Sequence, residues 1–206
     1  MTQHITIRPI KREDLHTLYH RMHDKKNDVP EWKKWDAPYV AYKKPSFRSF
    51  RNQLLEGMAE DMRYLIINED QMIGMVTYYW EHRSSCWLEA GIIIFNPAYW
   101  SGGYGTKAMF LWIDHLFEHL PLVRCGFTTW SGNKRMMRVG EKLGMTLEAR
   151  LRKCRFYDGV YYDSIRYGVL REEWTEQKKA VGAKLFNNDG EDAICARERL
   201  DQAQEE

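Results

Sequence analysis

Three glycines and a threonine are concentrated in the segment WSGGYGTKAM, residues 100–109. This segment follows the apolar run LEAGIIIF and leads into a run with helical spacing, KAMFLWIDHLFEHL. Glycines between a strand and a helix let the backbone approach a ligand closely, and the free amides of the first helical turn attract an anion. The chemistry that this spacing predicts is therefore the binding of a phosphate.

Two common phosphate-binding motifs fit this loop poorly. A Walker loop needs the order Gly-Lys-Ser/Thr, whereas here Gly105 is followed by Thr106 and then Lys107. Residues 103–108 do match the Rossmann pattern Gly-x-Gly-x-x-Ala, but an intervening segment separates them from the preceding strand. The loop also follows about the fourth strand instead of the first. The acidic residue that binds the ribose in a Rossmann domain is expected near Cys125, and none stands there.

The segments around the loop predict a mixed α/β layer of strands and helices. Alternating or continuous apolar residues predict strands in HITIRPI, RYLIIN, MIGMVTYYW, CWLEAGIIIF and VRCGFTTW, and a closing hairpin in MTLEARLRKCRF, YDG and VYYDSIRYGVL. Helical spacing predicts helices in REDLHTLYHRMHDKK, in SFRSFRNQLLEGMAED with Ser46 or Ser49 as its cap, after the glycine loop, and in NKRMMRVGEKL, which ends at Gly144. The segment NDVPEWKKWDAPYVAYKKP breaks these patterns and is predicted to be irregular.

Composition predicts one globular domain and a charged tail. The chain has 206 residues, of which 44% are hydrophobic and 14% aromatic, enough to bury a full core. We expect a domain over residues 1–174 and a peripheral tail over 175–206, which is charged and poor in large apolar residues. Because 31 basic and 29 acidic side chains nearly cancel, we expect neither a nucleic-acid nor a membrane partner.

The same survey predicts a cytoplasmic protein without a metal centre. The N-terminal residues lack the apolar core of a signal peptide, and no later run approaches the length of a membrane span. The four cysteines are far apart, which fits reduced thiols and argues against zinc or disulfides. Three histidines, His16, His20 and His23, share a face of the first helix, but solvated side chains explain them better than a metal site does.

The strand, aromatic spacer, glycine loop and helix resemble the GNAT superfamily of N-acetyltransferases, in particular its RimJ/RimL-like branch, which acetylates protein N-termini and small amines. The family's loop pattern, Arg/Gln-x-x-Gly-x-Gly/Ala, falls on Trp100, Gly103 and Gly105. The segments TIRPIKREDL, GNKRMMRVGEKLGM and DGVYYDSIRYGVLREEW are similar to its opening strand and helix, its asparagine loop and its closing strand. Over about residues 5 to 174, the resemblance implies the GNAT fold, a mixed and mostly antiparallel twisted sheet flanked by helices, with a splayed central strand.

By this resemblance the phosphate is the pyrophosphate of acetyl-coenzyme A, cradled by the loop amides. The family holds the pantetheine arm on unpaired backbone of the splayed strand, although three consecutive isoleucines are also what any buried strand contains. An asparagine before a helix is likewise an ordinary N-cap. The coenzyme-binding residues that the resemblance implies are Ile92, Ile93, Ile94, Trp100, Ser101, Gly102, Gly103, Tyr104, Gly105, Thr106, Asn133 and Arg138.

Glu89 matches a glutamate common in the RimJ/RimL-like branch and is the catalytic residue that we predict. A carboxylate near the cleft attracts an ammonium group and accepts its proton through water, whereas the alternative is an acid at the solvent edge of a strand. The general acid is missing from both positions where relatives carry one, since these are Gly140 and Met136 here. Asp163 matches a family aspartate that could meet a cationic acceptor, or it could pair with a strand neighbour.

The resemblance implies acetyl transfer to a primary amine by direct attack in a ternary complex. The acceptor is a protein N-terminus or a small amine such as a polyamine or an antibiotic, and the aromatic stretch within residues 28–50 is the predicted acceptor-site wall or lid. A protein of another class, which binds coenzyme A for regulation or structure after losing catalysis, is the alternative. A homodimer is a further expectation.

Overall fold

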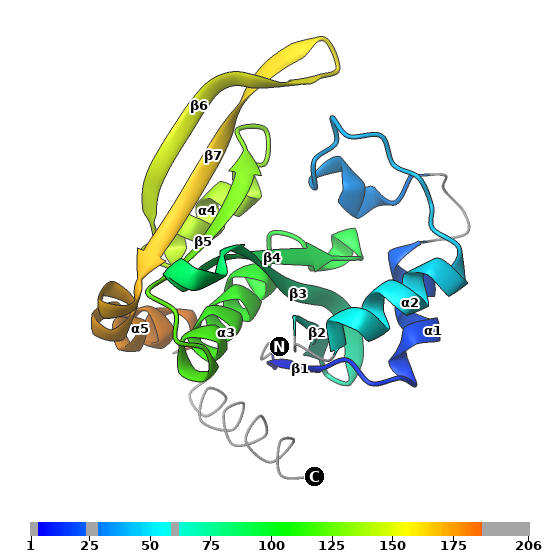
Figure 1. Cartoon of the computed structure of the whole chain (residues 1–206), viewed down its shortest axis with the longest axis horizontal. Coiled ribbons are helices and arrows are strands. Elements are labelled where there is room, and N and C mark those ends of the chain that lie inside the picture. Colours follow the sequence, from blue (N-terminus) through cyan, green and yellow to red (C-terminus); the bar gives the residue numbers. More distant parts are fainter. Residues whose placement is uncertain (1–3, 24–28, 59–61, 187–206) are drawn as a thin grey trace.

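The computed structural model of the chain describes residues 4–23, 29–58 and 62–186. Seven strands in these ranges form one mixed sheet in the order β1-β2-β3-β4-β5-β7-β6. The strands are β1 (Ile5–Pro9), β2 (Arg63–Asn68), β3 (Gln71–His82), β4 (Trp87–Ile94), β5 (Arg124–Trp130), β6 (Thr146–Tyr157) and β7 (Val160–Leu170). The helices are α1 (Asp14–Met22), α2 (Phe47–Met58), α3 (Tyr104–His119), α4 (Lys134–Lys142) and α5 (Arg171–Phe186), with short 3-10 helices η1 (Glu31–Lys34), η2 (Arg83–Ser85) and η3 (Pro97–Tyr99) (Figure 1).

The two halves of the sheet meet at a short parallel pair of strands. Strands β1 to β4 are neighbours in chain order and antiparallel, and β5, β7 and β6 continue the sheet. Parallel pairing of β4 with β5 covers three positions, the last of which joins Glu89 to Gly126. Beyond Glu89, residues 90–94 of β4 pair with β3 and have no described partner on their other side. The predicted splayed central strand is confirmed.

Different helices pack on the two faces of the sheet. Because successive side chains of a strand point to opposite faces, Leu88 and Ala90 lie in the core formed with α3 and α5, whereas Ile93 packs in the core formed with α1 and α2. Figure 1 shows α1 and α2 beside β2 and β3, at the opposite end of the molecule from the β6–β7 hairpin. The side chain of Glu89 therefore points to the α1/α2 face, close to where the sheet divides.

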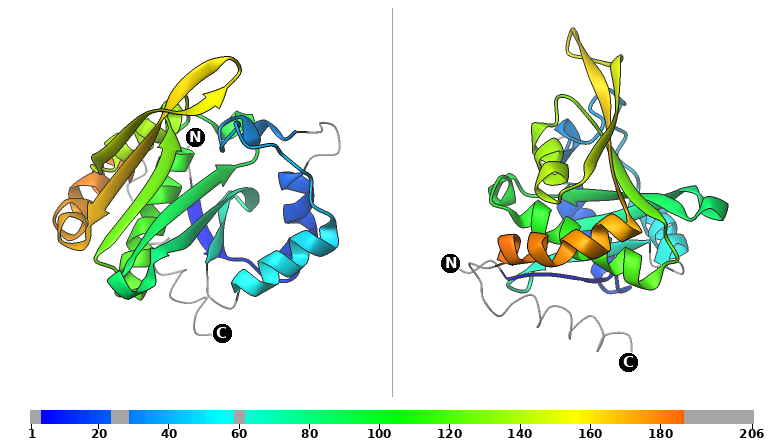
Figure 2. Two further views of the ribbon diagram at one scale, coloured as in Figure 1. Left: turned by 45° about the horizontal axis from the view of Figure 1, so that its top comes forward. Right: turned by 90° about the vertical axis from the view of Figure 1, so that its left-hand side faces the viewer.

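Local signals fix the ends of several helices. The hydroxyl of Ser46 accepts a hydrogen bond from the amide of Ser49 at 3.2 Å, so Ser46 is the N-cap of α2. Past the end of α4, Gly144 adopts a left-handed conformation with φ of 71°, as the sequence predicted for a helix stop. The turn of the closing hairpin also uses left-handed backbone, at Asp158 and Gly159. Figure 2 shows this hairpin projecting from the body in both views.

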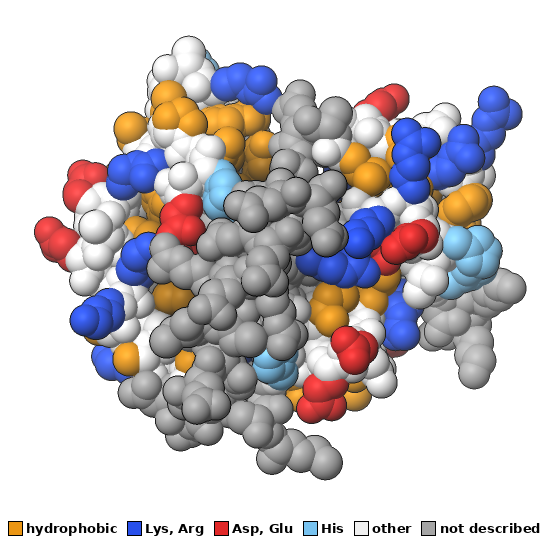
Figure 3. Space-filling model, turned by 90° about the horizontal axis from the view of Figure 1, so that it is seen from below, with side chains coloured by type: hydrophobic (Ala, Val, Ile, Leu, Met, Phe, Trp, Pro, Cys, Tyr) orange, Lys and Arg blue, Asp and Glu red, His pale blue; other side chains and the backbone are white. Residues whose placement is uncertain are grey.

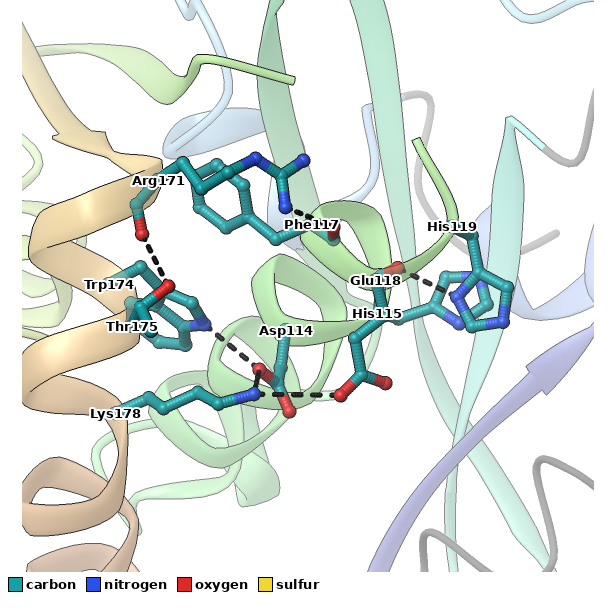
Figure 4. A network of polar contacts seen from close by, with 9 residues as sticks. All are labelled: Asp114, His115, Phe117, Glu118, His119, Arg171, Trp174, Thr175 and Lys178. Carbon is teal, nitrogen blue, oxygen red and sulfur yellow. Dashed lines mark hydrogen bonds and ion pairs between the residues drawn. The ribbon is translucent and has the colours of Figure 1, made fainter. Parts of the chain in front are cut away.

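Helix α5 is anchored on α3 by a network of polar contacts (Figure 4). The indole of Trp174, 1% exposed, donates to Asp114 at 3.0 Å, and the ammonium of Lys178 contacts the same carboxylate at 2.7 Å. The guanidinium of Arg171 donates to three backbone carbonyls that follow or end α3, those of Phe117, Leu120 and Leu122. These bonds satisfy carbonyls that the end of a helix leaves without partners.

The predicted boundary after residue 174 falls inside α5. Phe186, the last residue of the helix, is 6% exposed and packs edge-on against Phe110 of α3. Residues 175–186 therefore pack against the domain, because α5 carries apolar side chains at its inner positions in spite of its high charge. Residues 187–206 of the predicted tail lie outside the described residues.

On the face drawn in Figure 3, basic and acidic side chains are interspersed among apolar ones. Among the residues that the structure describes, no helix is long and apolar enough to cross a membrane.

Candidate active site

A cleft of about 330 Å³ opens where β4 and β5 diverge, between the glycine loop, α4 and the irregular segment 32–39. Most of the residues predicted to bind a coenzyme line it: Ile92, Ile93, Ile94, Trp100, Ser101, Gly103, Gly105, Thr106, Asn133 and Arg138. Three predicted site residues, Gly102, Tyr104 and Glu89, do not line this cleft. The structure thus brings the strand, the loop and the asparagine segment together around one space.

The glycine loop presents backbone amides to the cleft. Gly103 is the N-cap of α3 and has φ of 92°, a conformation that glycine adopts without steric cost. Its carbonyl accepts bonds from the amides of Thr106 at 3.0 Å and Lys107 at 3.1 Å. Helix geometry leaves the earlier amides, those of Tyr104 and Gly105, without such a partner. The amide of Gly105, which lines the cleft, is therefore free to bind an anion at this helix end, and that of Tyr104 lies next to it, outside the lining. The cradle predicted from the loop amides stays a prediction.

Gly105 is open to the cleft on its Cα side. A Cβ atom built there would meet only the Cδ1 of Ile92, at 3.8 Å, which is an ordinary van der Waals distance. The protein itself therefore has room for a side chain at this position. A small residue is useful here because a ligand can then come close to the backbone.

Cationic side chains of α4 lie along the same cleft. Arg138 and Lys142 line it together with Arg135, whose guanidinium lies 4.3 Å from the ring centre of Trp35 and 4.9 Å from that of Trp100. Such stacking fixes an arginine through the attraction between a cation and an aromatic face. With the free amides at the start of α3, these charges form a surface suited to a polyanion, and the pyrophosphate and phosphate groups of coenzyme A fit that requirement.

The irregular segment is tied across the opening between β4 and β5. The carbonyl oxygen of Trp35 accepts one bond from the indole of Trp130 at 3.0 Å and one from the side-chain amide of Asn133 at 3.1 Å. The oxygen of Asn133 accepts from the amide of Met136 at 3.1 Å, so this residue is also the N-cap of α4. Sequence reasoning placed Asn133 at the cleft but missed its bond to Trp35, because nothing local to either residue indicates it.

The wall predicted from the aromatic stretch lies at the cleft. Trp32, Trp35 and Tyr39 line it, and the indole of Trp32 donates to the carbonyl of Met22 at 2.8 Å, which anchors the segment to α1. Tyr39 lies edge-on to the ring of Trp130 and carries the guanidinium of Arg155 over its own ring, 5.1 Å from the centre. This side of the cleft is therefore largely aromatic.

Glu89 is fully buried on the face of the sheet that bears α1 and α2. One carboxylate oxygen accepts from the hydroxyl of Tyr79 at 2.9 Å, while the other has no hydrogen-bond partner and lies 3.9 Å from the guanidinium of Arg166. Tyr79 is its direct neighbour on β3. Glu89 is thus neither a wall of the cleft nor a solvated acid at a strand edge, because Tyr79 and Arg166 cover it.

A tyrosine and two arginines lie around Glu89. Burial, followed by the negative charge of Glu89, raises the pKa of Tyr79, so its hydroxyl stays a donor over the working pH range. Arg124, whose guanidinium is bound by both oxygens of Glu148, also lies near enough to Glu89 for their charges to interact. Sequence reasoning missed Tyr79 and Arg166. Strand alternation puts their side chains on the same face of the sheet as Glu89, but this can be seen only once the register of the strands is known.

The two positions that lack the expected general acid have different surroundings. A Cβ atom on Gly140 would lie 2.8 Å from the ring of Tyr167 and 2.9 Å from that of Phe127, so α4 packs too closely for a larger residue. Met136 lines the cleft but carries no proton donor. The tyrosines that line the cleft are Tyr39 and Tyr99, and the hydroxyl of Tyr99 donates to Gln71 at 3.1 Å.

Two further candidates have structural partners. Asp163 accepts from the guanidinium of Arg150 at 2.8 Å and from the amide of Lys153 at 3.0 Å, and the bond from that amide is the main cause that holds its pKa below the usual value. His16 and His20 contact each other at 3.3 Å, whereas His23 bonds to the hydroxyl of Tyr42 at 2.6 Å. Among the described residues, no cluster of histidine, cysteine or acidic side chains could hold a metal ion.

Comparison with known proteins gives one consistent result. The family model described as Acetyltransferase (GNAT) domain matches residues 4–146. Two proteins of Bacillus subtilis (strain 168) are similar over 173 residues: the uncharacterized N-acetyltransferase YnaD at 26% identity, covering 84% of this chain and 97% of the relative, and the SPbeta prophage-derived uncharacterized N-acetyltransferase YokL at 25%, covering 84% and 93%.

A solved structure supports the fold. The crystal structure of spermidine N-acetyltransferase from Vibrio cholerae in complex with CoA and spermine matches with a TM-score of 0.68 over 84% of this chain and 98% of that chain. Its sequence is 18% identical, so this likeness shows the fold alone. The predicted GNAT fold, a mixed sheet with flanking helices, is confirmed.

Proposed function

The chain belongs to the GNAT acetyltransferase family, and we propose that it transfers the acetyl group of acetyl-coenzyme A to a primary amine by direct attack in a ternary complex. The amine nitrogen forms a bond to the thioester carbonyl carbon, the carbon–sulfur bond breaks, and the thiolate takes up a proton. We place the chain in the RimJ/RimL-like branch, whose acceptors are protein N-termini and small amines. A spermidine acetyltransferase among the fold neighbours keeps polyamines among the candidates.

The part of the cleft formed by the glycine loop, α4 and the end of β4, which we call the coenzyme half, supports this proposal with backbone amides and cationic side chains. The amides of Tyr104 and Gly105 would bind the pyrophosphate, and Arg138 and Lys142 would complement its charge. The strand segment 92–94, which has no described partner toward β5, would hold the pantetheine arm and polarise the acetyl carbonyl through its backbone. Isoleucine side chains keep water from the thioester at this point.

Glu89 is the base in this proposal. An α-amine arrives mostly as ammonium, since its pKa is about 8, and a buried carboxylate beside it stabilises that charge and takes the proton. The unpartnered carboxylate oxygen is the observation behind this role, because a buried acceptor without a donor is costly unless a ligand satisfies it. Proton delivery to the thiolate falls to water, since Gly140 and Met136 cannot supply it.

The single observation that carries the proposal is the divergence of β4 and β5 after Glu89, which we call the fork, with the glycine loop beside it. This arrangement puts an anion site next to strand backbone that has no described partner. The test is to incubate the protein with acetyl-coenzyme A and a panel of amines and to follow the release of free thiol. Release that depends on an added amine is the expected result.

A second candidate is a coenzyme-A-binding regulatory or structural protein without catalysis. The lack of a proton donor at residues 136 and 140 is the observation that favours it. Calorimetric binding of coenzyme A without release of thiol for any amine would support this candidate against the first.

A further inference from the structure

Glu89 and Arg166 form an incomplete pair on the face of the sheet that bears α1 and α2. The unpartnered oxygen of Glu89 and the nearest guanidinium nitrogen of Arg166 are 3.9 Å apart, longer than the ~2.7–3.2 Å of a hydrogen bond. Glu89 is 0% exposed, whereas the side chain of Arg166 is 40% exposed. Among the described residues the side chain of Arg166 makes no hydrogen bond, although a guanidinium carries five donors.

The strand register places this pair at the acceptor side of the cleft. Arg166 lies directly opposite Thr128, which lines the cleft, and Gly126 lies opposite Glu89. Gly126 and its β7 neighbour Gly168 have no side chains, and the guanidinium of Arg124 and the carboxylate of Glu148 lie over them. Because Arg166 is 40% exposed and Glu89 is buried, an acceptor that enters the cleft along Thr128 would meet the guanidinium of Arg166 before the carboxylate of Glu89.

We propose that Arg166 selects acceptors that carry an oxygen beside the amine, the α-amino acyl group of an amino acid or of a peptide N-terminus. The guanidinium donates to the acceptor's carbonyl or carboxylate oxygen and moves off Glu89. The ammonium of the same acceptor then donates to the freed oxygen of Glu89. Arg166 is a specificity-determining residue in this scheme, which rests on the proposed acetyl transfer.

The same pair disfavours polyamines. A polyamine offers only cationic or neutral nitrogen donors, so it cannot accept a hydrogen bond from Arg166, and its charge is repelled by the guanidinium. An α-amino acyl group offers both an acceptor for Arg166 and a donor for Glu89. Of the acidic side chains near this pair, Glu148 is already bound to Arg124, and Glu81 lies near Tyr79.

The test compares four acceptors at saturating acetyl-coenzyme A: alanyl-alanine amide, free alanine, spermidine and butylamine. For Arg166→Gln we expect kcat/KM to fall on the order of 10- to 100-fold for the alanyl acceptors, as for the loss of one charge-assisted hydrogen bond. The value for spermidine and butylamine should stay or rise, because Glu89 is uncovered. Arg152→Gln, at an exposed arginine of β6, is the matched control and should change none of the four.

The two alanyl acceptors separate the two sources of the group, since a loss confined to free alanine assigns the site to amino acids and a loss confined to the amide assigns it to peptide N-termini. An equal loss for all four acceptors, or a wild type that prefers spermidine, would overturn the proposal while acetyl transfer stands. If no acceptor is acetylated, the proposed function fails. Calorimetry of alanyl-alanine amide binding to the coenzyme-A-loaded protein then tests the role of Arg166 by itself. Binding that Arg166→Gln weakens supports the selection of α-amino acyl groups, and equal or absent binding in the wild type and the variant overturns it.

Discussion

The proposed coenzyme half and the proposed acceptor half of the cleft are built from different chemical groups. Around the glycine loop, the groups that face the cleft are backbone amides at the start of α3 and strand backbone beyond Glu89, with cations from one helix. On the proposed acceptor side, the aromatic segment near Trp35 lines the cleft, and the side chains of β3, β4 and β7 that are proposed to act lie outside the lining. Backbone sites tolerate change in neighbouring side chains, whereas side-chain sites depend on each residue, so we expect mutations to affect the two halves separately.

Gly105→Val should have the largest effect, confined to the coenzyme half. The protein has room for the valine, but its methyl groups would occupy the space where a phosphate approaches the amides, so coenzyme A binding should be abolished in calorimetry. Far-UV circular dichroism and the melting temperature of the free protein should stay close to wild type. Thr175→Val, at an exposed position of α5, is the matched control. Unchanged coenzyme affinity in Gly105→Val would rule out the loop as the anion site.

Glu89→Gln should have the next largest effect, confined to the acceptor half. The amide keeps the size of the side chain and can still accept from Tyr79 but is no base, so the acetylation rate should fall by ~10²- to 10⁴-fold at neutral pH. Coenzyme A should bind with wild-type affinity, because its predicted contacts lie beyond the end of the β4–β5 pairing.

The pH profile sharpens this test. The wild-type rate should rise with pH as the bound amine, with a pKa of about 8, loses its proton, and the variant should recover part of its rate at high pH, where the amine is already neutral. Since burial and the charge of Glu89 raise the pKa of Tyr79, loss of the tyrosine proton does not distort this range. Equal rates for wild type and Glu89→Gln at every pH, with an acceptor that is turned over, would show that Glu89 is structural.

Coenzyme A alone should stabilise the wild type, even without an acceptor. A ligand that binds only the folded state at about 100 times its Kd adds ~2.7 kcal/mol to the free energy of unfolding. At roughly 2–4 °C per kcal/mol for a domain of this size, the melting temperature should rise by about 5–10 °C. Glu89→Gln should show the same rise and Gly105→Val none. No rise in the wild type at saturating coenzyme would count against both the enzyme and the coenzyme-binding alternative.

Trp35→Ala should have the smallest effect, and it should change both the coenzyme affinity and the KM of the acceptor. Its ring stacks with Arg135 on the coenzyme side, and a cation–π contact contributes ~0.5–2 kcal/mol, so we expect about a 2- to 30-fold loss of coenzyme affinity. The KM of the acceptor should rise as well, because the segment that Trp35 belongs to lines the cleft where we predict the acceptor wall. Trp80→Ala, at a tryptophan that stacks with Arg83 away from the cleft, is the matched control and should leave both constants unchanged.

Much of the fold and of the coenzyme half could be read from the sequence, because local chemistry determines them. Alternating apolar residues place a strand without reference to the rest of the chain, and Gly103 and Gly144 mark helix ends because their left-handed backbone suits glycine. The loop pattern indicates an anion site for the same reason, since the amides that would bind the anion belong to the next few residues of the chain.

Only the tertiary structure decided the acceptor half and the extent of the domain. Trp35 and Trp130 are 95 residues apart in the chain, and no local pattern states that their hydrogen bond closes the fork between β4 and β5. Glu89 meets Arg166 only because β5 and β7 come next to β4 in the sheet, and α5 joins the domain because Trp174 and Phe186 are buried against α3. A sequence fixes which backbone groups lie near one another along the chain, whereas the pairing of distant side chains depends on strand order and register, which form only when the whole sheet assembles.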